Sequence, residues 1–94
     1  MTDSPDDPPF EVPIEDALDL HPFAPREIPS VVNEYIRAAH AAGFREVRLV
    51  HGRGIGVLRA RVQQVLREHP LVTSYHDAPE SHLGATVAVL GNSL

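Results

Sequence analysis

The chain contains no cysteine, which excludes a disulfide framework and a thiolate metal site and favours a cytoplasmic location. No apolar run approaches the length of a membrane-spanning helix, and the first residues are acidic, whereas a signal peptide starts with basic ones. We therefore expect no membrane partner. A Gly-Lys-Ser/Thr sequence is also absent, which excludes the ATP-binding P-loop. Ninety-four residues predict one small domain, without a second domain or an internal repeat.

Lysine is absent too, so every fixed positive charge on a side chain is an arginine. The formal net charge of −5 hides an uneven distribution, because residues 1–16 hold six acids and no base. Residues 17–94 hold eight arginines against seven acids, and six of those arginines lie within residues 45–67 beside one acid, Glu46. Arginine suits bidentate phosphate contacts, so we expect a local positive patch. A solvated helix face explains part of these arginines equally well.

Three segments are expected along the chain. Residues 1–14 are rich in proline and acid and bury too little apolar surface to offset the entropy of ordering, which predicts a flexible tail. Residues 15–91 are predicted to form the folded domain, and residues 92–94 a short C-terminal tail.

Hydrophobic spacing predicts the order strand, helix, strand, helix, strand, strand. The strands are expected at residues 17–21, 47–50, 71–76 and 85–90, and the helices at about 26–42 and 58–69. Right-handed crossovers place both helices on one face of a four-stranded mixed sheet, so the predicted fold class is a two-layer α/β sandwich. Alternation predicts that Val87 and Val89 point toward the helices. It places the following side chains on the open face: Asp19, His21, Arg48, Thr86 and Ala88.

A glycine loop, His51-Gly52-Arg53-Gly54-Ile55-Gly56, separates the second strand from the second helix, and Arg59 lies one turn into that helix. Glycines let the backbone approach a ligand closely, and a helix start offers free N–H groups, so the loop is a candidate phosphate site. A tight strand-to-helix turn that merely needs glycine explains the same pattern, and spacing alone leaves both interpretations open. The candidate nucleic-acid contacts are Arg48, Gly52, Arg53, Gly54, Gly56 and Arg59.

The first two strands are expected to be parallel, so their carboxyl ends share the edge at which open α/β sheets bind ligands. Asp19 and His21 end the first strand there, and His51 follows the second. Topology therefore predicts that two sites distant in sequence meet. Each residue also has a simpler explanation. Asp19 could cap a loop, His21 could pack under Phe23, and His51 could hydrogen-bond the backbone of its own turn.

Leu18-Asp19-Leu20-His21 and His51-Gly52-Arg53-Gly54, separated by one helix, resemble the paired Leu-Asp-x-His and His-Gly-x-Gly motifs of the small MutS-related (Smr) domain family. The resemblance extends over about residues 16–91 through three further stretches: Gly56-Val57-Leu58-Arg59, His69-Pro70-Leu71-Val72 and Gly84-Ala85-Thr86-Val87. It implies a fold similar to the C-terminal domain of translation initiation factor three. The chain departs from the family pattern at Pro22, at Ile55 and in a last turn whose only glycine is Gly84, which leaves the shape of the substrate open.

The resemblance implies a nucleic-acid-binding domain, and specifically an endonuclease that cuts RNA or nicks structured DNA. In this interpretation His21 and His51 exchange protons at the phosphodiester, and Asp19 orients a histidine. Arg53 and Arg59 hold the phosphate. We expect no cofactor, because a single carboxylate supplies too few ligands for a metal site. The alternative is a divalent ion such as Mg²⁺ bound with the help of Asp19.

Two other classes of function stay open: a non-catalytic nucleic-acid-binding domain, and a protein-interaction module that uses the open sheet face. Raised salt weakens nucleic-acid binding, and strand cleavage marks a nuclease, so two simple assays separate the three. His76 and His82 could reach substrate but match no zinc-ligand spacing, and His40 is expected to be solvated. The choice of RNA or DNA, the oligomeric state and association with a larger complex, such as the ribosome or the repair machinery, stay open.

Overall fold

The structure is a computed structural model that describes residues 14–54 and 56–91. Of the expected tails at 1–14 and 92–94, all residues except Ile14 lie outside the described residues. The main elements in chain order are β1 (Ala17–Asp19), α1 (Ile28–Ala41), β2 (Glu46–Val50), α2 (Val57–Glu68), β3 (Val72–Asp77) and β4 (Ala85–Leu90). Two short 3-10 turns, η1 (Pro25–Glu27) and η2 (Pro79–Ser81), precede α1 and β4. This order matches the predicted one.

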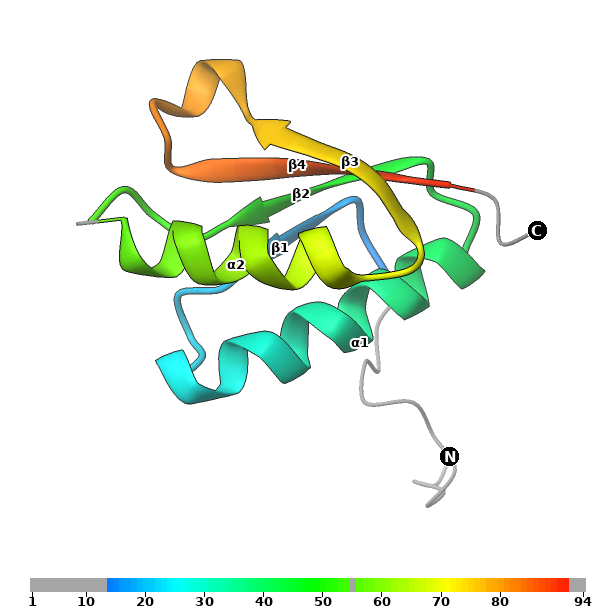
Figure 1. The fold of residues 1–94 in the computed structure, drawn as a ribbon, viewed down its shortest axis with the longest axis horizontal. Coiled ribbons are helices and arrows are strands. Elements are labelled where there is room, and N and C mark those ends of the chain that lie inside the picture. The colour runs from blue at the N-terminus through cyan, green and yellow to red at the C-terminus, as the bar shows by residue number, and fades with distance from the viewer. Residues whose placement is uncertain (1–13, 55, 92–94) are drawn as a thin grey trace.

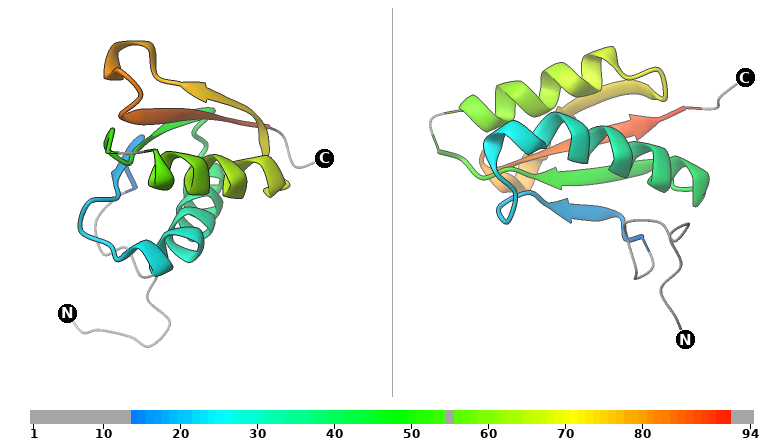
Figure 2. Two further views of the ribbon diagram at one scale, coloured as in Figure 1. Left: turned by 60° about the vertical axis from the view of Figure 1, so that its left-hand side comes forward. Right: turned by 90° about the horizontal axis from the view of Figure 1, so that it is seen from below.

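The four strands form one mixed sheet in the order β1-β2-β4-β3. β1 runs parallel to β2, whereas β4 runs antiparallel to both of its neighbours. Both helices lie over the same face of this sheet (Figures 1 and 2). The predicted two-layer α/β sandwich is therefore confirmed.

The main core lies between the helices and the sheet. Its buried members are at most 7 % exposed: Leu20, Ile28, Val32, Tyr35, Ile36, Ala39, Val47, Leu49, Val62, Leu66, Ala88 and Leu90. Along α1 the spacing Ile28, Val32, Ile36 puts one aliphatic stripe against the sheet. Ile14, the last residue of the expected tail, instead packs against this core. The Tyr35 hydroxyl donates to the Glu15 backbone carbonyl, so the described chain is anchored from its first residues.

The two faces of β4 are the reverse of the prediction. Thr86 and Ala88 are fully buried, and in the register they pair with Leu49 and Val47, which belong to the helix-facing core. Val87 instead forms a second cluster on the other face with Ala78, Ala85 and Val50. β4 is an inner strand that is covered on both sides, so apolar character does not identify its inward face. Small side chains stand where α2 crosses the strand.

His40 is not solvated as expected. Its Nε2 lies 2.7 Å from the carbonyl oxygen of Gly91, and because a carbonyl only accepts, Nε2 carries the proton and donates. The contact joins the last turn of α1 to the residue that follows β4. α1 ends at Ala41 with Ala42 as its cap residue, and the chain leaves the helix through Gly43, whose φ of +92° suits the glycine that was predicted to stop the helix.

Candidate active site

The two sequence motifs meet at one edge of the sheet, as topology predicted. Asp19 pairs with Val50 at the carboxyl ends of β1 and β2, and the Leu20 N–H extends the ladder by donating to the Val50 carbonyl at 2.9 Å. The chain then turns into His21 on one side and into the glycine loop on the other. A Cβ placed on Gly52 would lie 3.0 Å from His21 Nε2, so the imidazole rests directly against the loop backbone.

Asp19 and His21 form an exposed dyad. Asp19 Oδ1 accepts the backbone N–H of His21 at 2.9 Å and lies 2.6 Å from its Nδ1. The backbone bond first and the imidazole second lower the pKa of Asp19, so the carboxyl is ionised at neutral pH. Because a carboxylate only accepts, Nδ1 carries a proton, and Nε2 of the neutral ring has a free lone pair. The Asp19 and His21 side chains are 62 % and 61 % exposed, so a ligand can reach the dyad from solvent.

Position 52 of the loop requires glycine for two reasons. Its φ is +83°, a conformation that other residues adopt with strain, and any side chain would press on the His21 ring. The N–H groups of His51 and Gly52 both donate to the carbonyl of Gly84, at 3.1 and 2.9 Å. These two amides therefore hold the loop against the start of β4 and are not available to a phosphate.

His51 is only 3 % exposed and uses both ring nitrogens within the protein. Nδ1 lies 2.9 Å from the Gly52 carbonyl and donates to it, because a carbonyl only accepts. Nε2 then accepts the hydroxyl proton of Thr86 at 2.9 Å. The structure does not support the predicted proton exchange between His51 and a substrate, since no nitrogen is left for it. His51 instead fixes the conformation of the loop, which was the simpler explanation.

The Thr86 hydroxyl continues this network into α2 and β3. It accepts a hydrogen bond from Gln63 Nε2 at 3.0 Å, and the same amide donates to Asp77 Oδ1 at 3.1 Å. Arg59 grips Asp77 in a fork, with two N···O distances of 2.7 Å. The guanidinium is the main cause of the lowered pKa of Asp77. One connected set of polar side chains thus links the loop to two other elements.

The arginines predicted to contact nucleic acid do not share one role. Arg59 is engaged by Asp77, and Arg48 pairs with Glu80, so both positive charges are matched by carboxylates. Arg53 is exposed, and within residues 14–54 and 56–91 it takes part in no ion pair. Of these three arginines, Arg53 is therefore the one free to bind an anion.

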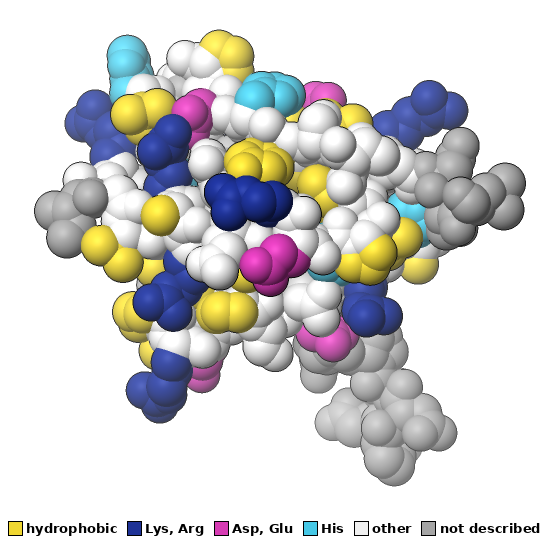
Figure 3. All heavy atoms as spheres, viewed as in Figure 1, with side chains coloured by type: hydrophobic (Ala, Val, Ile, Leu, Met, Phe, Trp, Pro, Cys, Tyr) yellow, Lys and Arg dark blue, Asp and Glu magenta, His cyan; other side chains and the backbone are white. Residues whose placement is uncertain are grey.

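A cavity of about 750 Å³ opens beside the loop. It is lined by Arg53, Gly54, Gly56, Arg59, His82 and Leu83. His82 thus lines this cavity, whereas exposed His76 pairs in register with Val87, on the face away from the helices. Arg side chains stand out on both sides of this end of the molecule, at the left of Figure 3, with hydrophobic side chains between them.

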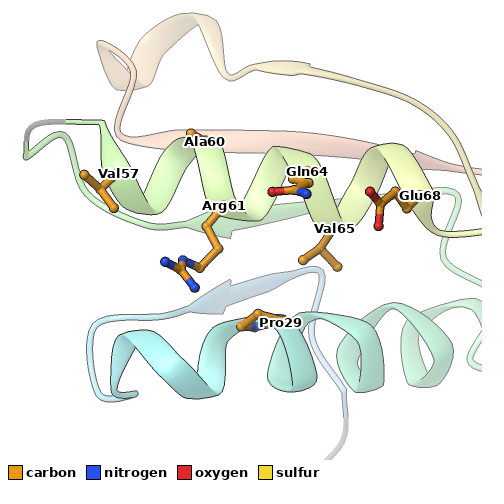
Figure 4. A pocket seen from close by; sticks show the side chains of 7 residues that line it. All are labelled: Pro29, Val57, Ala60, Arg61, Gln64, Val65 and Glu68. Atoms are coloured by element: carbon orange, nitrogen blue, oxygen red, sulfur yellow. The ribbon is translucent and has the colours of Figure 1, made fainter.

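A second hollow, of about 450 Å³, lies between the two helices (Figure 4). Its lining is mostly aliphatic, and its charged members are Arg61 and Glu68. It contains no residue of either motif. The chemistry is therefore concentrated at the sheet edge and not in this groove.

Sequence reasoning missed Gln63, Asp77, Thr86 and Leu83. The four-residue spacing from Arg59 to Gln63 places both on one helix face and could have suggested a shared partner. Thr86 was assigned to the wrong face, so its contact with His51 could not be found. Asp77 and Leu83 carried no local signal.

Within the described part of the chain, no three His, Cys, Asp or Glu side chains come together as a set that could hold a metal ion. Among the helices of residues 14–54 and 56–91, none combines the length and the apolar character needed to cross a membrane.

The model of the Smr domain family matches residues 18–90. Endonuclease MutS2 from Clostridium perfringens is 35 % identical over 79 residues, which are 82 % of this chain and 10 % of that protein. Endonuclease MutS2 from Enterococcus faecalis is 42 % identical over 72 residues, 74 % of this chain and 9 % of that protein. The chain thus spans about a tenth of the length of these relatives.

Two solved structures share the fold. The Smr domain of Thermus thermophilus MutS2 superposes with a TM-score of 0.77 at 32 % identity, covering 83 % of this chain and all of that one. YdaL, a stand-alone small MutS-related protein from Escherichia coli, gives a TM-score of 0.74 at 28 % identity and covers 82 % of this chain and 65 % of that one.

Proposed function

The chain belongs to the Smr domain family, and from that premise we propose that it is a nucleic-acid-binding endonuclease that cleaves a phosphodiester in RNA or structured DNA. It is homologous to the Smr domains of MutS2 endonucleases. The observation that carries the proposal is the Asp19–His21 dyad, whose free Nε2 stands against the Gly52 backbone. We place its action in the cytoplasm, with nucleic acid as the partner.

His21 supplies the proton chemistry. In RNA, its Nε2 removes the proton of the 2′-hydroxyl, whose oxygen attacks the adjacent phosphorus. The leaving 5′ oxygen lies on the opposite side of the phosphorus and takes a proton from water. Asp19 holds the imidazole in the Nδ1–H tautomer and stabilises the imidazolium that forms. General acid–base catalysis of this kind contributes about 100-fold to 10,000-fold in rate.

Arg53 and the start of α2 hold the phosphate. The Arg53 guanidinium is exposed and matches a phosphate in two hydrogen bonds. Gly56 caps α2 without a side chain, so no cap oxygen competes for the N–H groups of the first helical turn. Arg59 and Arg48 stay with their carboxylates, and His51 keeps the loop in place.

The donor set around the dyad does not fit a resident Mg²⁺ well. Asp19 Oδ1 already accepts two hydrogen bonds, which leaves one carboxylate oxygen for an ion that prefers six oxygen ligands. We therefore propose that cleavage needs no metal. In a metal-assisted variant, Asp19 would be the ligand and the ion would activate water.

The experiment incubates the chain with labelled single-stranded RNA, duplex DNA and branched DNA, with and without a chelator. We expect cleavage of at least one substrate that persists in the chelator and is lost in His21→Ala. His76→Ala serves as the control, because His76 is an exposed histidine of the face away from the helices. Binding without cleavage of any substrate would contradict the endonuclease and favour a non-catalytic binding domain.

A further inference from the structure

The turn before β4 has an unusual backbone. Among the residues that the structure describes, His82 and Leu83 are the two non-glycine residues with positive φ, at 53° and 72°. This region is unfavourable for residues with a side chain, and more so for leucine than for asparagine or histidine. Such strain persists only where the surroundings impose it, and it concentrates at functional sites.

The surroundings impose it here through Gly84. The Gly84 carbonyl accepts the N–H groups of both His51 and Gly52, so the turn is joined to the glycine loop. On the other side of the turn, the Ala78 N–H donates to the Ala85 carbonyl at 2.9 Å. The strained pair is therefore held between two fixed points, one of them the loop that carries Arg53.

Burial does not compensate for the strain. Leu83 is 51 % exposed, and His82 is exposed as well. A leucine that adds little to the core and sits in an unfavourable backbone conformation is not explained by the stability of the fold. An apolar surface that the chain itself leaves uncovered is suited to contact with a ligand.

The cavity beside the loop indicates which ligand. Arg53 and the backbone of Gly54 and Gly56 form one wall, and His82 and Leu83 form another. One wall therefore suits an anion, and the other suits a flat apolar group. A nucleotide has both parts. Histidine stacks on unpaired bases, and apolar side chains pack against the face of a base that has left its stack.

We propose that His82 and Leu83 form a platform for an unpaired base next to the phosphate held by Arg53. Bases within an intact duplex are stacked and cannot reach this wall, so the platform makes the domain prefer single-stranded or branched nucleic acid. The proposal rests on the proposed function, since it uses the same phosphate position.

The test compares wild-type protein, Leu83→Gly and His82→Asn in binding a short single-stranded RNA and a duplex DNA of equal length. Glycine and asparagine tolerate positive φ, so both variants keep the turn while removing the platform. We expect Leu83→Gly to unfold at the same or a higher temperature. It should lose about 5-fold or more in affinity for the single strand, the scale of one lost base contact, with duplex binding unchanged.

Gln64→Ala is the control, because Gln64 is an exposed residue of α2 that lines the hollow between the helices, away from the glycine loop (Figure 4). It should leave both affinities unchanged. Arg53→Ala separates the two proposals, because it should weaken binding to every nucleic acid. If it does so while Leu83→Gly keeps the single-strand preference, the platform is refuted and the phosphate site stands. A marked fall in the unfolding temperature of Leu83→Gly would give the side chain a structural role and also refute the platform.

Discussion

Replacing Thr86 with valine tests the buried network that holds the glycine loop. The Thr86 hydroxyl donates to His51 Nε2 and accepts from Gln63, and its side chain is fully buried. Valine has nearly the same shape, so the packing is kept while the hydroxyl is lost. His51 Nε2 would then be a buried acceptor without a partner, and water has no access to replace it.

The expected cost follows from that single orphaned atom. A buried polar group without a partner costs about 1–3 kcal/mol, so we take about 2 kcal/mol for His51. Gln63 loses less, because its amide keeps Asp77 and is half-buried. For a domain of this size a change of about 2 kcal/mol lowers the unfolding temperature by roughly 8–16 °C. Cleavage should fall as well, because the backbone that supports the His21 ring loosens.

Urea denaturation and thermal melting measure this cost, and two variants act as controls. Thr86→Ser keeps the hydroxyl and loses one buried methyl group, which costs about 1 kcal/mol. Thr73→Val is the same substitution at an exposed strand position, where the hydroxyl donates to the Val89 carbonyl, and should change stability by about 0.5 kcal/mol or less. A Thr86→Val protein as stable as the wild type, or Thr86→Ser losing as much as valine, would refute the role of the hydroxyl.

Three further predictions concern charge. Arg53→Ala should reduce the salt slope of nucleic-acid binding by about one unit and leave the unfolding temperature unchanged; equal slopes for wild type and Arg53→Ala would contradict this. Arg59→Ala should instead lower the unfolding temperature, because Asp77 loses its ion-pair partner. Burial lowers the pKa of His69 below 6.5, so the unfolded chain binds a proton that the folded chain does not, and the free energy of unfolding falls as pH drops below 6.5. His69→Gln should flatten that part of a melting-temperature curve, and an unaltered slope would exclude His69 as its cause. Deleting residues 1–13 removes four acids and should strengthen nucleic-acid binding at low salt without changing the unfolding temperature. A large fall in the unfolding temperature would show that the segment supports the fold.

The first strand was predictable because one of its faces is wet. Leu18 and Leu20 alternate with Asp19 and His21, and β1 is an edge strand whose polar positions meet solvent. The contact between Asp19 and His21 is local, two residues apart, so spacing alone could suggest that the acid orients a histidine. The contact of His21 with Gly52 was predictable because the parallel strands β1 and β2 end at the same edge of the sheet.

β4 could not be read in the same way. Both of its faces are buried, so Thr86 and Val87 carry no contrast between water and core, and alternation gave the wrong face. The face of β4 that points toward the helices is set by its register with β2, where Leu49 lies opposite Thr86. A single sequence does not encode that pairing in any local pattern.

The roles of His51 and Arg59 depended on distant partners. A histidine after a strand looks the same whether it meets substrate or the hydroxyl of a threonine 35 residues away. Arg59 likewise points at a carboxylate 18 residues further along the chain, Asp77. Sequence analysis predicts that both residues contact the nucleic acid, because both lie in or next to the glycine loop. Their true neighbours come from packing.

The division of roles between His21 and His51 is tested most directly by chemical rescue. His21→Ala should unfold within a few degrees of the wild type, because the ring is exposed, and should cut at least about 100-fold more slowly while still binding nucleic acid. Added imidazole should restore its cleavage in proportion to concentration. His51→Ala should melt at a clearly lower temperature, and imidazole should not restore its rate. Cleavage at the wild-type rate by His21→Ala, or rescue of His51→Ala at an unchanged unfolding temperature, would contradict the assignment.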